Sequence, residues 1–309
     1  MSRTRRLLFI LAVTVASLPF GTAHAVEYPY APYNEGKMDP QKTGWPLTDA
    51  EKTFMLKPEF DRKPGHEASR HLPAMWPVTP TAGYRGKEVG DTRWLDIHAK
   101  LVAAVQANKD STDILLVGDS ITEYMGGSAI NGQPFIAPWQ KHFGNIKTVN
   151  AGLAGDKIEG VLWRLEHGLL DGASPKVIVL MIGVNDAPLI TACSMPSESV
   201  AEGIKLCVDN LREKCPSSQV VVVKILPAFE PGKPVHEDIK KVNAFLDGLK
   251  LDGDPKVHVL DVWNDFMNPD GSLKATAYSD GHLHLNDAGY EIYAAKLKPF
   301  VDGISANSK

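Results

Sequence analysis

From residue 93 onward, short apolar runs alternate with amphipathic segments, and this alternation restricts the fold more than any other feature of the chain. Five runs of strand length occur at residues 113–117, 146–150, 176–182, 219–226 and 257–262. Helical spacing of apolar residues marks the segments around 97–105, at 158–166, 197–213 and 237–250, and from about residue 286. Runs that are apolar throughout suit strands buried on both faces, as in parallel sheets. The pattern therefore predicts an α/β fold with a parallel sheet and helices on both of its faces.

The first 25 residues have the features of an export signal. Three arginines within the first six residues precede an apolar stretch at 7–20, and residues 23–25 read Ala-His-Ala, which fits a cleavage site. We therefore expect cleavage after Ala25 and a periplasmic or secreted protein, with an uncleaved anchor as the alternative. No other apolar run is long enough to span a bilayer, so no stable membrane insertion is expected after cleavage.

Residues 26–90 are irregular and contain many prolines. We interpret them as an N-terminal extension packed on a main domain formed by residues 91–309. Aromatic side chains in the extension, such as Trp45 and Trp76, either line a substrate groove or attach an extended chain to the surface. The charge of the chain is −4, and no block of Lys and Arg occurs beyond the N-terminus. Nucleic acid and anionic membrane surfaces are therefore not expected as partners.

The chain has three cysteines, Cys193, Cys207 and Cys215. Export permits a disulfide, and the odd count leaves at least one thiol unpaired within the chain. Cys207 and Cys215 are expected on one helix about 12 Å apart, which is too far for a bond between them. A bridge, if one exists, is therefore expected to use Cys193.

Polar motifs follow the apolar runs at the points where parallel strands would end. Gly118-Asp119-Ser120 follows the first run, a loop containing Gly155 follows the second, and Asn185 follows the third. A further motif near the C-terminus contains Asp280, His282 and His284. Ligands of open α/β sheets bind beyond the carboxyl ends of the strands, so we expect these motifs to lie together.

The residue types in these motifs suit acyl transfer. Ser120 is a candidate nucleophile if a base removes its proton, and His284 can be that base, oriented by Asp280. The N–H groups of Ser120 and Gly155 and the side-chain amide of Asn185 are candidate donors to an oxyanion. Each residue also has a simpler interpretation: Ser120 and Asp119 as helix caps, Gly155 as a turn and Asn185 as an Asx-turn.

A metal site and a cofactor site are not predicted. His282 and His284 with Asp280 could ligate a metal, but no other cluster has ligand spacing. The chain also lacks a phosphate loop, a dinucleotide fingerprint and the Gly-x-Ser-x-Gly elbow of the usual α/β-hydrolases.

Taken together, the motifs resemble the SGNH (GDSL-like) hydrolase superfamily over roughly residues 110–300. That family is named for residues of four blocks, which match Ser120, Gly155, Asn185 and His284 in order. The Gly-Asp-Ser-Ile-Thr motif, Trp163-Arg164-Leu165 and the Gly-Val-Asn-Asp block are most similar to platelet-activating-factor acetylhydrolases and bacterial carbohydrate acetylesterases. The resemblance implies a three-layer α/β/α sandwich of flavodoxin-like type with a five-stranded parallel sheet.

One departure from the family concerns the catalytic aspartate, which usually lies three residues before the histidine. Here Gly281 has that position relative to His284, and Asp280 lies four residues before it. His284 is preferred to His282 because the residues after it match the family. An extra residue is then expected to bulge between Asp280 and His284. Family members can also use a backbone carbonyl to assist the histidine.

These observations predict an exported serine esterase that cleaves short-chain acyl esters, above all O-acetyl groups on carbohydrate, through an acyl-enzyme. The alternatives are an O-acyltransferase acting on a glycan, a lysophospholipase or thioesterase, and a non-catalytic binding module. The expected partner is a small acylated substrate.

Overall fold

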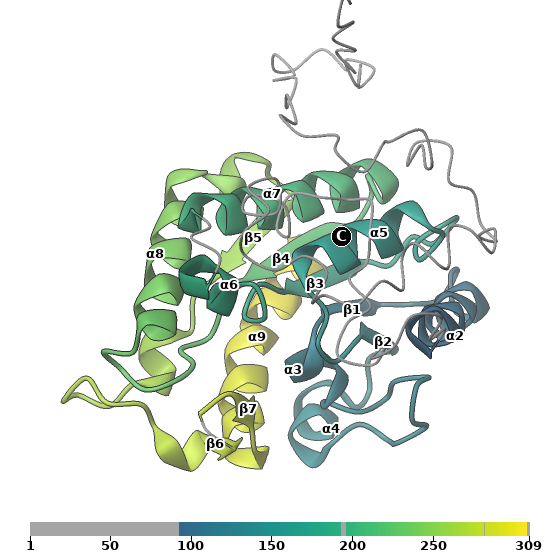
Figure 1. The fold of residues 1–309 in the computed structure, drawn as a ribbon. Coiled ribbons are helices and arrows are strands. Elements are labelled where there is room, and N and C mark those ends of the chain that lie inside the picture. Colours follow the sequence, from purple (N-terminus) through teal and green to yellow (C-terminus); the bar gives the residue numbers. More distant parts are fainter. Residues whose placement is uncertain (1–92, 193–195, 281, 308–309) are drawn as a thin grey trace, which may run out of the picture. The chain divides into compact units, whose positions relative to one another are not determined.

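The computed structural model describes residues 93–192, 196–280 and 282–307, without the side chains of residues 93–95, 192, 280 and 305–307 (Figure 1). The predicted signal and extension, at residues 1–90, and Cys193 lie outside the described residues. Cys207 and Cys215 are buried free thiols. No helix in the described ranges is long and apolar enough to cross a membrane.

Five parallel strands form the central sheet, in the order β2-β1-β3-β4-β5. They are β1 (Ile114–Gly118), β2 (Thr148–Gly152), β3 (Val177–Met181), β4 (Gln219–Val223) and β5 (Val257–Leu260). This is the flavodoxin-like order, in which the chain reverses direction across the sheet between β1 and β3. The predicted α/β class, the five strands and their parallel arrangement are confirmed.

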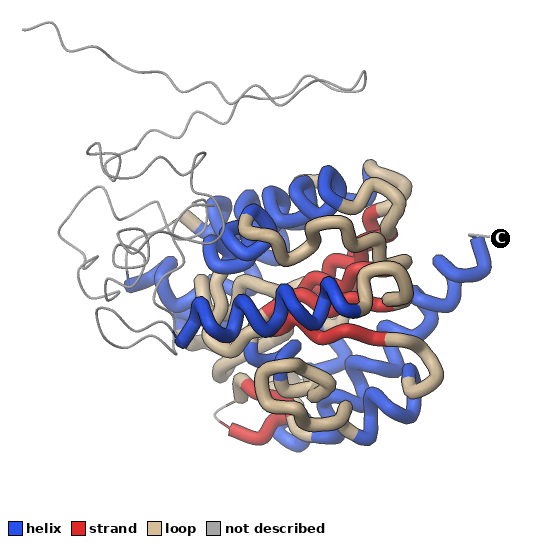
Figure 2. Tube along the Cα trace, turned by 90° about the vertical axis from the view of Figure 1, so that its right-hand side faces the viewer, coloured by secondary structure: helices blue, strands red, loops and turns tan. Residues whose placement is uncertain are grey.

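Helices cover both faces of the sheet (Figure 2). The longer helices are α2 (Arg93–Ala107), α5 (Ile158–Glu166), α7 (Ser197–Lys214), α8 (Pro234–Gly248) and α9 (Asp287–Asn307). The short ones are α3 (Ser120–Glu123), α4 (Ala137–Phe143) and α6 (Ala187–Ala192). α5 packs on α7 and α7 on α8 at one face, whereas α4 packs on α9 at the other.

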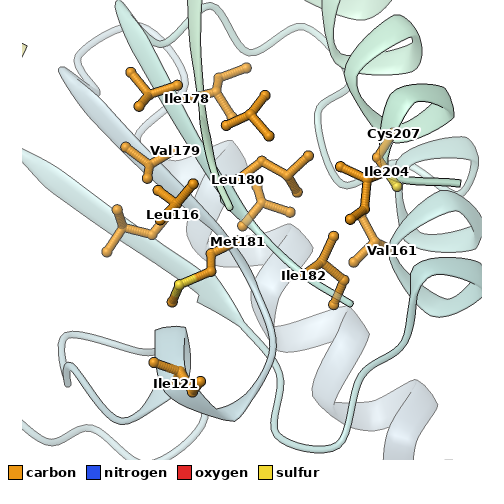
Figure 3. Packing of buried hydrophobic residues seen from close by; sticks show 14 of the residues in the cluster. Leu116, Ile121, Val161, Ile178, Val179, Leu180, Met181, Ile182, Ile204 and Cys207 are labelled. Carbon is orange, nitrogen blue, oxygen red and sulfur yellow. The ribbon is translucent and has the colours of Figure 1, made fainter. Parts of the chain in front are cut away.

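The core explains why the strand runs are apolar throughout. Along β3, Ile178 and Leu180 alternate with Val179 and Met181, so that successive side chains lie on opposite faces of the sheet (Figure 3). All four are buried because each face carries its own helices. Burial of both faces, rather than of one, therefore replaces the polar alternation of a half-exposed strand.

The strand ends differ from the predictions where apolar residues continue past the ladder. β4 ends at Val223, although the predicted strand continued past Lys224 to residue 226. Ile225 is buried, but its N–H donates to Asn243 Oδ1 on α8 at 3.1 Å instead of to a neighbouring strand. Side-chain burial in a loop thus produces the same sequence pattern as burial in a strand.

Short elements were not predicted from periodicity. α4 is held by the buried Trp139 and Phe143, whose rings stack with centroids 4.3 Å apart. A hairpin of β6 (Tyr278–Asp280) and β7 (His284–Leu285) forms a separate antiparallel pair beside α3. Segments of two or three residues have no measurable period, so tertiary contacts define them.

Candidate active site

Ser120 and His284 lie within hydrogen-bonding distance of each other. Ser120 is the first residue of α3, directly beyond the end of β1, and its Oγ lies 3.0 Å from His284 Nε2 on β7. Ser120 is nearly buried, whereas His284 is partly exposed. A separation of about 3 Å allows direct proton transfer from the hydroxyl to the imidazole.

Neighbouring elements hold α3, which has only four residues. Asp119 caps it, because Oδ1 accepts a hydrogen bond from the Ile121 N–H at 3.0 Å. The Tyr290 hydroxyl on α9 donates to the Ile121 carbonyl at 2.8 Å, and Asn150 Nδ2 on β2 donates to the Thr122 carbonyl at 2.7 Å. A single helical turn is unstable by itself, so these contacts determine the position of Ser120.

The hairpin β6–β7 presents His284 to Ser120. In the ladder the backbone of Asp280 lies directly opposite His284, and residues 282 and 283 lie in the turn that precedes His284. The register irregularity falls between Tyr278 and Asp280. The bulge expected between Asp280 and His284 stays a prediction, because residue 281 lies outside the described residues. Of the described turn residues, His282 has a positive φ of 60°. The orienting role of Asp280 stays a prediction, since its side chain is not described.

His282 lies in the same hairpin but makes different contacts from His284. Its ring packs edge-on against Tyr278, with centroids 5.9 Å apart. Its carbonyl accepts a hydrogen bond from the Phe229 N–H at 2.9 Å, which links the hairpin to the loop after β4. Within the described ranges no three His, Cys, Asp or Glu side chains are grouped closely enough to hold a metal ion.

The predicted oxyanion donors follow three neighbouring strands. Ser120 follows β1, Gly155 lies in the loop after β2, and Asn185 lies between β3 and α6. Gly155 has a φ of +79°, which residues other than glycine rarely adopt. Asn185 Nδ2 donates to the Asp156 carbonyl at 2.8 Å. This bond uses one of the two amide N–H donors and joins Asn185 to the residue after Gly155.

A buried ion pair next to Gly155 was not predicted from the sequence. Arg164 on α5 is fully buried, and its Nε and Nη2 donate to Asp156 Oδ2 at 2.9 and 2.6 Å. Its Nη1 donates to the Ala151 carbonyl of β2 at 2.8 Å. A side chain at Gly160 would collide with the Asp156 carboxylate, so the glycine makes room for the pair.

Asp156 therefore connects the predicted donors. Its carboxylate binds Arg164, its carbonyl binds Asn185, and it follows Gly155 directly in the chain. The signal in the sequence was a single arginine among the apolar residues of 158–166, eight positions after an aspartate. Charged side chains are rarely buried unless they are paired, which makes such a residue a candidate for a buried ion pair.

Burial also changes the acidity of carboxyl groups around Ser120. It raises the pKa of Asp119 to about 7, with a smaller contribution from the Asp156 charge. Burial raises the pKa of Asp156 to about 6, although the Arg164 charge acts in the opposite direction. Burial, followed by the Glu159 charge, places the pKa of Asp186 well above its usual range. The site is therefore built on carboxyl groups that are costly to ionise.

We expect Asp119→Asn to remove part of the pH dependence of stability. The unfolded Asp119 loses its proton near pH 3.8 and the folded one near 7, so deprotonation favours the unfolded chain between these values. Stability present at acidic pH is thus lost as the pH rises, by up to about 4 kcal/mol at neutral pH. Asn stays neutral and its amide oxygen can still accept from Ile121.

Urea unfolding of both proteins at several pH values from 4 to 8 measures this effect. The free energy of unfolding of the wild type, relative to Asp119→Asn, should fall across the range. Substitution of the exposed Asp252 by Asn is the matched control and should leave the wild-type pH dependence in place. Parallel curves for wild type and Asp119→Asn would show that Asp119 does not titrate in this way.

Known proteins share both the sequence blocks and the fold. Residues 116–292, which include Ser120 and His284, match the family model of the GDSL-like Lipase/Acylhydrolase family. Platelet-activating factor acetylhydrolase IB subunit alpha1 from Bos taurus is 31% identical over 201 residues, which are 65% of this chain and 79% of the relative. The alpha2 subunit from Rattus norvegicus is also 31% identical over 201 residues, 65% of this chain and 80% of its own length. A solved GDSL-like lipase from Bacteroides thetaiotaomicron superposes with a TM-score of 0.53 at 17% identity, covering 69% of this chain and 98% of that one.

Proposed function

The chain belongs to the GDSL-like lipase/acylhydrolase family, and we propose that it is a serine esterase that removes short acyl groups, above all acetyl, from carbohydrate. The observation that carries the proposal is the 3.0 Å distance between Ser120 Oγ and His284 Nε2. A serine hydroxyl becomes an effective nucleophile only when a base lies this close. Following the predicted export signal, we assign the enzyme to the periplasm or the exterior of the cell.

In the proposed mechanism, Ser120 Oγ attacks the acyl carbon while His284 Nε2 accepts the hydroxyl proton. The carbonyl electron pair moves onto oxygen, where the N–H groups of Ser120 and Gly155 and the amide of Asn185 stabilise the charge. The intermediate then expels the alcohol, which takes its proton from His284. Water, deprotonated by His284, then attacks the acyl carbon, and the bond from that carbon to Ser120 Oγ breaks. Ser120 Oγ takes the proton back from His284, and the acid is released. Asp280 is assigned the role of orienting the imidazole.

Two observations support a short acyl group. Among the described side chains, only Tyr124 and Phe245 are large, hydrophobic and exposed. Two such residues, one after α3 and one on α8, are too few to form a broad apolar surface for a long acyl chain. In addition, the relatives that are 31% identical are named acetylhydrolases.

We expect kcat/KM for p-nitrophenyl esters not to rise from acetate to octanoate, because the added methylenes gain no burial. A panel of acetylated oligosaccharides should release acetate.

A fluorophosphonate probe should label the full-length chain at Ser120, as located by mass spectrometry. A preference for octanoate would favour a lipase, and the absence of any label on Ser120 would remove the serine-esterase proposal.

Hydrolysis and transfer differ only in what accepts the acyl group. Product analysis with and without a glycan acceptor separates them, since a transferase forms an acylated acceptor at the expense of free acetate. Acetate as the main product in the presence of an acceptor supports the hydrolase. Acylated acceptor as the main product would replace hydrolase by O-acyltransferase.

A further inference from the structure

Tyr124 is an exposed aromatic residue at the edge of the candidate active site. It follows the four residues of α3 as the C-cap, and its N–H donates to the Ser120 carbonyl at 2.9 Å. Of the surface of Tyr124, 44% is exposed to solvent. Its ring centroid lies 5.1 Å from that of His284, at an interplanar angle of 50°. Tyr124 therefore borders the imidazole that the mechanism uses.

The contact with His284 places Tyr124 on one particular side of the reacting carbon. His284 must protonate the leaving oxygen, so the alcohol part of the substrate has to approach the imidazole. Of the three proposed oxyanion donors, Gly155 and Asn185 come after β2 and β3, and only the Ser120 N–H lies on α3 with Tyr124. Because His284 protonates the leaving oxygen in the proposed mechanism, its ring contact with Tyr124 is the observation that places Tyr124 beside the alcohol.

We propose that Tyr124 forms the subsite for the sugar ring of the leaving alcohol; this inference rests on the proposed esterase function. The face of a pyranose carries C–H groups that pack against an aromatic ring, and the phenol hydroxyl supplies a hydrogen-bonding partner for sugar hydroxyls. A flexible alkyl chain needs a wider apolar surface, and neighbouring large aromatic side chains such as Trp139 and Tyr290 are buried. A single exposed tyrosine suits one ring better than a lipid tail.

The test compares two acetate esters that differ only in the alcohol: ethyl acetate and an O-acetylated xylo-oligosaccharide. Tyr124→Ala should lose about tenfold more kcat/KM on the sugar ester than on ethyl acetate, since only the sugar ring loses its packing surface. The selective loss should fall mainly on KM. Tyr124→Phe keeps the ring and should recover most of the activity on the sugar ester.

Phe245→Ala is the matched control, because Phe245 is the other large exposed hydrophobic residue of the described chain and lies on α8. It should leave the ratio of the two activities unchanged. Equal losses on both esters in Tyr124→Ala would overturn the subsite and make Tyr124 a support for His284. The proposed subsite would also be overturned if the wild-type enzyme cleaved ethyl acetate but not the sugar ester. Failure of the proposed esterase function is recognised separately, by a wild type that cleaves neither ester and does not react with a fluorophosphonate.

Discussion

Ser120→Ala is expected to lower kcat for acetyl esters by roughly 10⁴-fold or more, because Ser120 is the nucleophile that forms the acyl-enzyme in the proposed mechanism. The Ser120 hydroxyl lies 3.0 Å from His284 Nε2, and its loss leaves the imidazole without a proton to accept. The residual rate should come from the oxyanion donors and substrate binding alone. Initial rates of acetate release, corrected for the concentration of folded protein, measure the effect.

The fold should survive this substitution. Removing one hydroxyl from a partly solvated pair costs about 1 kcal/mol of unfolding free energy, so the thermal midpoint should change little. Ser217→Ala is the control, since Ser217 is exposed in the turn between α7 and β4 at the opposite ends of the strands. Turnover by Ser120→Ala at the rate of the control would remove Ser120 from the mechanism.

Arg164→Met should have the largest effect on stability, about 3–5 kcal/mol of unfolding free energy. It leaves the Asp156 carboxylate buried without the guanidinium that lies 2.6 Å away. It also removes the donor to the Ala151 carbonyl at the end of β2. Arg164→Lys should be intermediate, because one ammonium group cannot reproduce the planar set of donors. Urea unfolding at neutral pH measures the three proteins.

The same substitution should reduce catalysis in the protein that stays folded. Asp156 joins Gly155 to Asn185, so loosening it displaces two of the proposed oxyanion donors, and kcat should fall by about 10²-fold or more. Titration with a fluorophosphonate counts the folded sites, which separates this loss from unfolding. Lys205→Met on α7 removes an exposed ion pair with Asp209 and should cost less than about 1 kcal/mol. A loss from Arg164→Met no larger than that of this control would contradict a structural role for the buried pair.

Local sequence patterns predicted helices best where the periodic segment is long, and strands best where both faces of the sheet are buried. The helix predicted at 158–166 has the bounds Ile158–Glu166 in the structure. The predicted strand β4 extended too far. Ile225 is buried but lies in a loop, where its N–H donates to Asn243 Oδ1. The elements next to the site, α3 and the β6–β7 hairpin, are too short for periodicity to detect.

By itself the sequence determined the class of fold and the edge of the sheet at which the candidate site lies. Hydrophobic period is a local property, and parallel strands bring their carboxyl ends to one edge. Only the tertiary structure decided that His284 reaches Ser120, that His282 turns toward Tyr278, and that Arg164 binds Asp156. Those contacts join residues through space, and the packing of neighbouring elements determines which side chains meet.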